Sequence, residues 1–167
     1  PMIDVPLQAG DDLVEKLTRE IEVLDHRGER ACHRVAGSAG EHRAEAYRLL
    51  AHSLEQEGRL DEAEATLRTA IGETDVTDVE AGRLAFDLAA FFQRHDRPAD
   101  AEEMYSETLR FDGSVAPAYL NRANVRVEAG SYPEAADDYE LYLALRPRSA
   151  QRAQVEQMIL LLQQEIE

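Results

Sequence analysis

Residues Ala116 to Ser149 read APAYLNRANVRVEAGSYPEAADDYELYLALRPRS, and this stretch decides the fold. It predicts two α-helices, 116–129 and 132–145, with Gly130 at the turn between them and Pro147 at the close. Pro133 lies in the first turn of the second helix, where a missing N–H costs nothing. Ser131 and Glu134 fit a capping box, in which a hydroxyl and a carboxylate satisfy two free backbone N–H groups.

The same pattern occurs twice more, from Ala44 and from Gly82. Counted from the first residue of each copy, positions eight, twenty and twenty-four carry small or apolar side chains: Ala51, Ala89 and Ala123; Ala63, Ala101 and Ala135; Leu67, Tyr105 and Tyr139. The middle copy is the weakest, because Asp96 replaces the turn glycine and Gly113 replaces the closing proline. The pattern predicts helix pairs at 41–57 with 61–71 and at 78–94 with 98–111, and we expect the position-eight alanines to be buried where paired helices approach closely.

This repeat resembles the tetratricopeptide repeat (TPR) family, whose unit is two helices in about 34 residues. The resemblance covers about two thirds of the chain and implies an all-α, right-handed helical solenoid with repeats at 44–77, 82–115 and 116–149.

We expect a flexible arm at 1–10 and a single TPR domain over 11–167. Within that domain, residues 11–36 form either one long N-terminal helix or a degenerate fourth repeat, and Thr77 with Glu80 forms a second capping box. Residues 73–76 are an insertion in a connecting loop. Residues 150–167, capped by Ser149, form a helix that covers the open end of the stack.

The chain is strongly acidic, with 34 acidic against 18 basic residues and a formal net charge of -16. The acids are spread over every segment, which argues against binding phosphate backbones or anionic membrane surfaces. The charge therefore favours a protein or peptide partner that is neutral, basic or partly apolar, although acidity also serves solubility alone.

No catalytic or metal-binding pattern is evident. Five histidines and the single Cys32 lack the spacing of a metal site, and no glycine-rich phosphate loop is present. The longest apolar run, Met158 to Leu162, is far shorter than the ~20 residues of a membrane span. We therefore expect no enzyme activity, no cofactor, no metal and no membrane insertion. We also expect a cytoplasmic location, although an export signal already removed would leave the same sequence.

The resemblance also implies where a ligand would bind, because the first helices of successive TPR repeats line a concave groove. The positions that this register places in or beside the groove give the candidate peptide-binding residues: Arg48, His52, Arg83, Phe86, Leu120, Asn121, Asn124 and Val127. The two asparagines carry amides able to hold a peptide backbone, and Phe86, Leu120 and Val127 offer apolar contact. Arg126 stands at a position where the other copies have Leu54 and Phe92, so its charge needs a partner or solvent.

One TPR class grips the terminal carboxylate of chaperone tails with lysines, an arginine and asparagines. The single lysine here, Lys16, lies outside the repeats, and Pro117 and Leu120 occupy positions where that clamp needs polar groups. A carboxylate clamp is therefore not expected. The predicted function is a non-enzymatic adaptor that binds a peptide or protein segment. The alternatives are a small secretion-type TPR chaperone and, less favoured, an enzyme or ligand-binding protein with its site in the groove.

The C-terminal helix carries more apolar residues than a cap needs. Val155, Met158, Ile159 and Leu162 can cover the third repeat, which leaves Leu160 and Leu161 pointing away from it. Exposed leucines in a cluster often mark an interface, and one self-complementary patch closes a two-fold dimer. Homodimerisation through Leu160 and Leu161 is one prediction, and their burial within the monomer is the alternative.

Overall fold

A computed structural model describes residues 43–72 and 78–166, and every regular element in these ranges is an α-helix. The chain divides into two compact units, Pro1–Val76 and Thr77–Glu167, each described here by itself. The predictions for the arm at 1–10, for residues 11–36, for the insertion at 73–76 and for a capping box at Thr77 lie outside the described residues.

Between residues 43 and 72, the described part of the first unit, lie two paired helices, α3 (Arg43–Gln56) and α4 (Leu60–Gly72), joined by a tight turn. The side chains at the contact are buried, with Tyr47, Ala51 and Leu54 on α3 and Ala63 and Leu67 on α4. This pair is the first predicted repeat.

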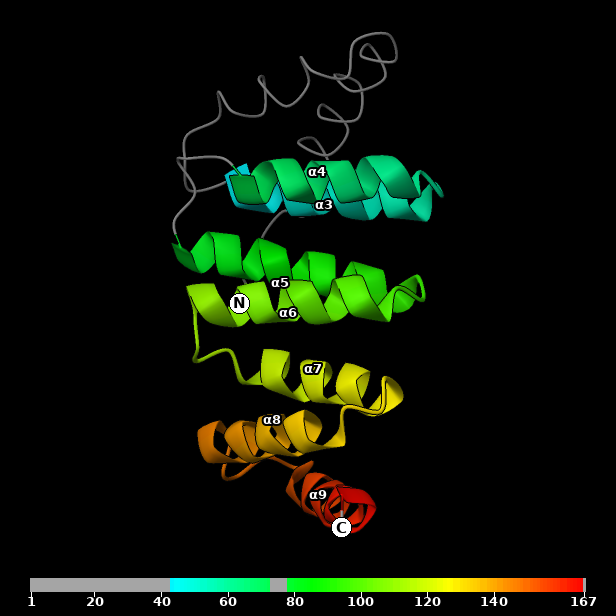
Figure 1. Cartoon of the computed structure of the whole chain (residues 1–167). Helices are drawn as coiled ribbons and strands as arrows, with labels where there is room; N and C mark the ends of the chain where they lie inside the picture. The colour runs from blue at the N-terminus through cyan, green and yellow to red at the C-terminus, as the bar shows by residue number, and fades with distance from the viewer. Residues whose placement is uncertain (1–42, 73–77, 167) are drawn as a thin grey trace, which may run out of the picture. The chain divides into compact units, whose positions relative to one another are not determined.

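The second unit contains five helices in series: α5 (Asp78–Arg94), α6 (Pro98–Phe111), α7 (Ala116–Glu128), α8 (Tyr132–Leu145) and α9 (Arg152–Ile166). Each helix packs against the next along the chain, so the unit is a stack in sequence order (Figure 1). The α5–α6 and α7–α8 pairs are the second and third predicted repeats. A core of Ala123, Ala135, Tyr139, Val155 and Leu162 joins α9 to the third repeat.

All nine residues at the repeating positions are at most 4% exposed, which confirms the predicted burial of the position-eight alanines Ala51, Ala89 and Ala123. Small side chains are needed at the alanine positions because the helices of a pair approach closely. At the α5–α6 contact, a Cβ added to Gly82 would lie only 3.2 Å from the Cβ of Phe111. The repeat register predicted from the alanines therefore matches the helix packing in the structure.

The turn inside each helix pair repeats the same geometry. One residue has a positive φ in each case, 76° at Gly58, 57° at Asp96 and 78° at Gly130. The next residue then donates its N–H to a carbonyl five residues earlier, as from Arg97 to Phe92 at 2.9 Å. Aspartate is one of the few residues that enter the left-handed region readily. Asp96 therefore takes the glycine's place without changing the turn.

Two helix starts differ from the prediction. The prediction of a capping box at Ser131 is wrong, because the Ser131 hydroxyl makes no cap hydrogen bond. The backbone of Ser131, at φ -84° and ψ 64°, also lies outside the extended region that a capping residue adopts. Helix α9 begins at Arg152 rather than at Ala150, and the Ser149 hydroxyl accepts the N–H of Gln151 at 3.1 Å. Pro98 and Pro133 do lie in first turns.

Candidate functional site

Six of the eight candidate residues lie on two helices of the second unit. Arg83 and Phe86 are on α5, and Leu120, Asn121, Asn124 and Val127 are on α7. Arg83 is exposed and the other five are half-buried, so each has surface available to a ligand. We call these six residues the α5–α7 face.

Tyr105 on α6 connects the two helices of this face. Its ring meets Phe86 edge-on, with 5.6 Å between the ring centroids. Its hydroxyl donates to Oε1 of Gln93 at 2.8 Å and accepts from Nδ2 of Asn121 at 3.2 Å. Because the one hydroxyl proton goes to Gln93, Tyr105 can only accept from Asn121, and this fixes the orientation of the asparagine amide. The positions of Phe86 and Asn121 are therefore coupled through one buried tyrosine.

The second asparagine, Asn124, is held by Tyr139, the tyrosine at the equivalent position of its own repeat. The hydroxyl of Tyr139 donates to Oδ1 of Asn124 at 2.7 Å. Within the described residues, Nδ2 of Asn124 and Oδ1 of Asn121 have no hydrogen-bond partner. The α5–α7 face thus presents an oriented donor and an oriented acceptor, the pair that a peptide backbone needs.

The tyrosines that hold the asparagines are themselves shielded from water. Burial raises the pKa of Tyr105, although the Asn121 hydrogen bond and the charge of Arg94 offset part of this effect. Burial also raises the pKa of Tyr139, and the negative charge of Glu128 adds to it. Both hydroxyls therefore stay protonated at neutral pH and keep their hydrogen bonds.

The apolar members of the face rest on the core. Leu120 and Val127 pack against the cluster of Tyr139, Tyr142 and the α9 side chains while keeping part of their surface exposed. Their positions are therefore fixed by the fold, which lowers the entropy lost when a ligand binds.

The remaining two candidates belong to the first unit. Arg48 and His52 both lie on α3 and both are exposed. Arg48 donates to the carboxylate of Glu45 at 2.7 Å. They stay predictions for the first repeat.

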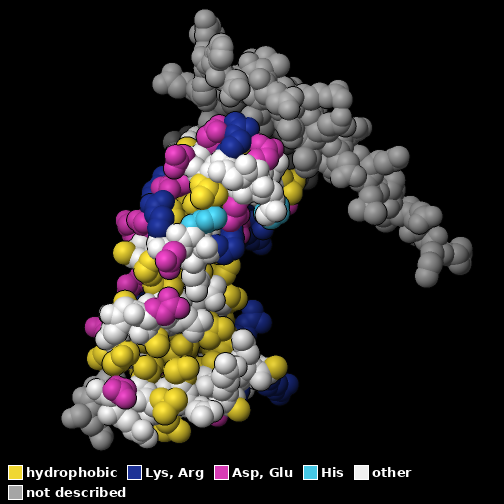
Figure 2. Space-filling view, turned by 90° about the vertical axis from the view of Figure 1, so that its right-hand side faces the viewer, with side chains coloured by type: hydrophobic (Ala, Val, Ile, Leu, Met, Phe, Trp, Pro, Cys, Tyr) yellow, Lys and Arg dark blue, Asp and Glu magenta, His cyan; other side chains and the backbone are white. Residues whose placement is uncertain are grey.

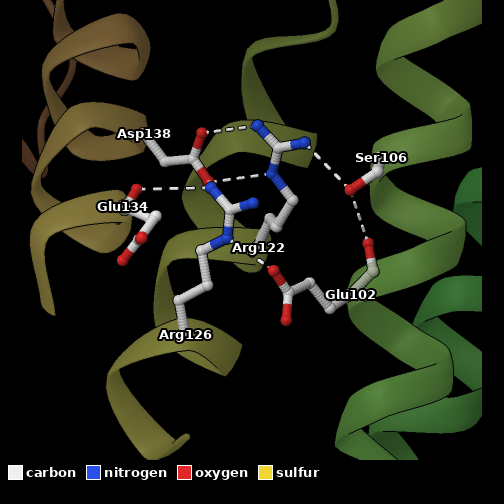
Figure 3. A network of polar contacts seen from close by, with 6 residues as sticks. All are labelled: Glu102, Ser106, Arg122, Arg126, Glu134 and Asp138. Carbon is white, nitrogen blue, oxygen red and sulfur yellow. Dashed lines mark hydrogen bonds and ion pairs between the residues drawn. The ribbon is translucent and has the colours of Figure 1, made fainter. Parts of the chain in front are cut away.

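Arg126, whose charge lacked an evident partner in the sequence, belongs to a buried ion network (Figure 3). It bonds to Glu102 on α6 at 2.7 Å and to Asp138 on α8 at 2.9 Å. Arg122 grips the same Asp138 through two bonds, at 2.6 and 2.8 Å, and reaches Ser106 on α6 at 3.0 Å. Burial opposes the charge of Arg122, but the hydrogen bonds and attraction of Asp138 outweigh it and hold its pKa above the ordinary value.

This network joins three helices of two successive repeats. Asp138 is only 2% exposed, and its two arginine partners are 14% and 18% exposed. A carboxylate so buried is stable only when fully paired. The network therefore holds α6, α7 and α8 together.

Sequence reasoning did not identify Tyr105, Gln93 or Asp138 as parts of these networks. A signal existed for Tyr105. Tyr105 and Tyr139 occupy the same repeat position, and a tyrosine at a buried position needs a hydroxyl partner. Asp138 has no such signal, because a charge in a helix is usually on the solvated side.

Helix α9 buries one side and leaves two leucines in water. Val155, Ile159 and Leu162 are buried, whereas Leu160 is 61% and Leu161 is 49% exposed. On the face shown in Figure 2, apolar side chains gather over the part of the second unit that holds its C-terminal helices. The predicted division of the α9 side chains is thus present in the second unit.

No cluster of three or more histidine, cysteine or acidic side chains that could hold a metal ion occurs in 43–72 or 78–166. Across the same ranges, no helix has the length and apolarity needed to cross a membrane.

The sequence and the structure of the chain were compared with those of known proteins. No protein-family model matches the sequence, and no curated protein matches it. Solved structures do match. The first TPR domain of Spaghetti (RPAP3), bound to the HSP90 peptide SRMEEVD, superposes with a TM-score of 0.59 at 21% identity, covering 74% of this chain and 92% of that one. The fold is that of a TPR domain.

Two further solved structures superpose on this chain with similar scores. The Yersinia enterocolitica type III secretion chaperone SycD, in complex with a peptide of the translocator YopD, gives a TM-score of 0.61 at 18% identity and covers 74% of this chain and 94% of that one. MamA gives 0.63 at 14% identity and covers 98% of this chain and 86% of that one. At these identities the likeness establishes the TPR helical solenoid fold, and the ligand has to be argued from this chain's own residues.

Proposed function

We propose that this TPR protein is a non-enzymatic adaptor that binds a peptide or protein segment on its α5–α7 face. The observation that carries the proposal is the pair of oriented amides. Asn124 offers a donor and Asn121 an acceptor, and tyrosine hydroxyls hold both in place. An extended chain has backbone groups that must be paired when they leave water, so fixed partners of both kinds suit it.

The side chains around the two asparagine amides indicate what kind of ligand would bind. Phe86, Leu120 and Val127 are apolar and half-buried, so a segment with apolar side chains gains from contact with them. The net charge of -16 repels an acidic segment and attracts a basic one, so it favours a neutral or basic ligand over an acidic one. We therefore propose a partly apolar ligand without a run of acids.

The comparisons support a peptide ligand of some kind. The RPAP3 domain and SycD each hold a peptide of another protein in their structures. The RPAP3 ligand, SRMEEVD, is acidic at its end, whereas here Pro117 and Leu120 stand where a carboxylate clamp needs polar groups. Peptide binding is the property we carry over to this chain, and the clamp chemistry is not.

A second candidate function is a small secretion-type chaperone. SycD is covered over 94% of its length, and it is a chaperone of that kind. An adaptor and a chaperone share the binding chemistry and differ in the partner, so the contacts of the α5–α7 face suit both.

Affinity capture with the full chain, followed by mass spectrometry, separates the two. An adaptor retains the members of a stable multiprotein complex, and a chaperone retains one exported substrate. Capture by wild type and by Phe86→Ala with Asn124→Ala is compared, so that only proteins lost from the variant count as ligands of the face. If wild type and variant retain the same proteins in the same amounts, the face is not the binding site.

A further inference from the structure

A second candidate site lies away from the α5–α7 amides, where α8 turns into α9. An open hollow of about 510 Å³ lies there. Its walls come from the start of α7, the last turn of α8 and the loop after it, and include Pro117, Tyr142, Leu145, Arg146, Pro147 and Arg148. Ligand pockets are commonly of this size and mostly apolar, with a few polar groups that fix orientation.

The two arginines of the hollow differ from most others in the molecule. Most arginines whose side chains are described are in ion pairs or other polar contacts with a neighbour. Among these described side chains, the guanidinium groups of Arg146, Arg148 and Arg83 have none. Two of these three cations line one hollow.

The surroundings of the hollow lack the acids that dominate the rest of the chain. Residues 113–127 and 141–155 contain no aspartate or glutamate, and they are the two longest such stretches in the sequence. All the residues that line the hollow come from these two stretches. The residues that line the hollow thus include two arginines and no acid, within a protein whose net charge is -16.

The loop that carries the arginines is held firmly. Tyr142 is buried, and its hydroxyl bonds to the Ser149 hydroxyl at 2.7 Å and to Oε1 of Gln151 at 3.0 Å. Arg152 donates to the carbonyl of Pro147 at 3.0 Å. With its backbone fixed on both sides, the loop presents Arg146 and Arg148 without a large ordering cost.

We infer that this hollow binds an acidic peptide segment with an apolar side chain between its carboxylates. Arginine pairs with carboxylates through two parallel hydrogen bonds, and Pro117, Leu145 and Pro147 offer the apolar contact. The volume far exceeds that of a simple anion, so a peptide segment fits the hollow better than an isolated phosphate. This site is independent of the α5–α7 face and takes a ligand of opposite charge.

The test uses the full chain and two fluorescein-labelled peptides, EELEE and its uncharged counterpart QQLQQ, with fluorescence polarisation at low ionic strength. The overall charge of the protein repels EELEE, so a preference for EELEE can arise only at a local basic site. We expect wild type to bind EELEE about tenfold more tightly than QQLQQ. Equal affinity, or tighter binding of QQLQQ, would overturn the inference.

Two variants place the site. Arg146→Gln with Arg148→Gln should abolish the preference for EELEE, and it should fold normally because no partner of either guanidinium is left unpaired. Arg94→Gln with Arg110→Gln removes the same charge from two exposed positions of the same unit, outside both the hollow and the α5–α7 face, and should keep the preference. If both variants lose the preference equally, or if neither does, the hollow is not the site. Leu145→Ala, at an exposed lining position, should weaken both peptides, and unchanged binding of both would contradict the apolar contact.

Discussion

Asp138 on α8 accepts two hydrogen bonds from one guanidinium, Nη2 of Arg122 at 2.6 Å and Nε at 2.8 Å. The two residues lie in different helices of the third repeat, and both are mostly buried. The pair is also tied to the second repeat, because Arg122 bonds to Ser106 and Arg126, the second cation on Asp138, bonds to Glu102.

Asp138→Asn should lower the free energy of unfolding by about 3 kcal/mol, because removing one partner leaves charges uncompensated in a buried site. Both arginines keep some exposure, which places the expected loss at the lower end of the range for buried pairs. Chemical denaturation monitored by circular dichroism gives the value. Glu107→Gln is the matched control, since it breaks the exposed pair with Arg110 on α6 and should cost no more than about 1 kcal/mol. Equal losses from the two variants would show that the Asp138 network does not stabilise the fold.

Ala89→Leu should lower the free energy of unfolding by about 1–3 kcal/mol, because Ala89 is fully buried where α5 meets α6 and extra methylenes overpack that contact. Ala144→Leu makes the same change at an exposed position of α8 and should stay within about 0.5 kcal/mol of wild type. Thermal melts of the two variants are compared with that of wild type. A melting temperature for Ala89→Leu that matches wild type would mean that the alanine register is wrong.

The repeat spacing predicted the helices and their buried alanines because these depend on local periodicity and side-chain size. The same spacing could not show that Arg126 pairs with Glu102, 24 residues away, since that contact depends on how one helix pair stacks on the next. It also misjudged Ser131, where the sequence fits a capping box but the tight turn sets a backbone conformation that prevents it.

The candidate face shows a similar division. The family register placed Asn121 and Asn124 correctly on α7, but it gave no sign that tyrosine hydroxyls orient their amides. That arrangement requires Tyr105 and Tyr139 to reach across from α6 and α8, which only the folded chain defines.

Alkaline pH should destabilise the protein through its buried tyrosines. In the unfolded chain a tyrosine loses its proton near pH 10, whereas burial raises the pKa of Tyr105 and Tyr139 in the folded state. Above about pH 10 the unfolded state therefore binds fewer protons than the folded state, and the free energy of unfolding falls as pH rises. Urea midpoints at about pH 8 and about pH 11 measure this fall.

Tyr139→Phe isolates the effect. It should cost about 1 kcal/mol at neutral pH through the lost bond to Asn124, and it should show a smaller loss of stability between the two pH values than wild type. An equal or larger alkaline loss in the variant would show that Tyr139 does not titrate as proposed.

Homodimerisation through α9 is tested by replacing Leu160 and Leu161 with glutamate. Both side chains are largely exposed within the second unit, so the change should leave the helix content intact while removing an apolar interface. Light scattering at high micromolar concentration should give a dimer mass for wild type and a monomer mass for the variant. A monomeric wild type would rule out the dimer, and a variant that unfolds would assign the leucines to the monomer core.

The central claim is that the α5–α7 face binds the partner segment. Phe86→Ala with Asn124→Ala removes an apolar contact and an oriented donor from half-buried positions, and the loss in affinity for the captured partner should be about tenfold or more. Glu103→Ala with Asp137→Ala alters two exposed side chains on α6 and α8 and should bind as wild type does. The most direct measurement is the dissociation constant of that partner for the three proteins by titration calorimetry, with circular dichroism confirming that each is folded. The account predicts weaker binding by the face variant alone, and equal affinity for all three folded proteins would contradict it.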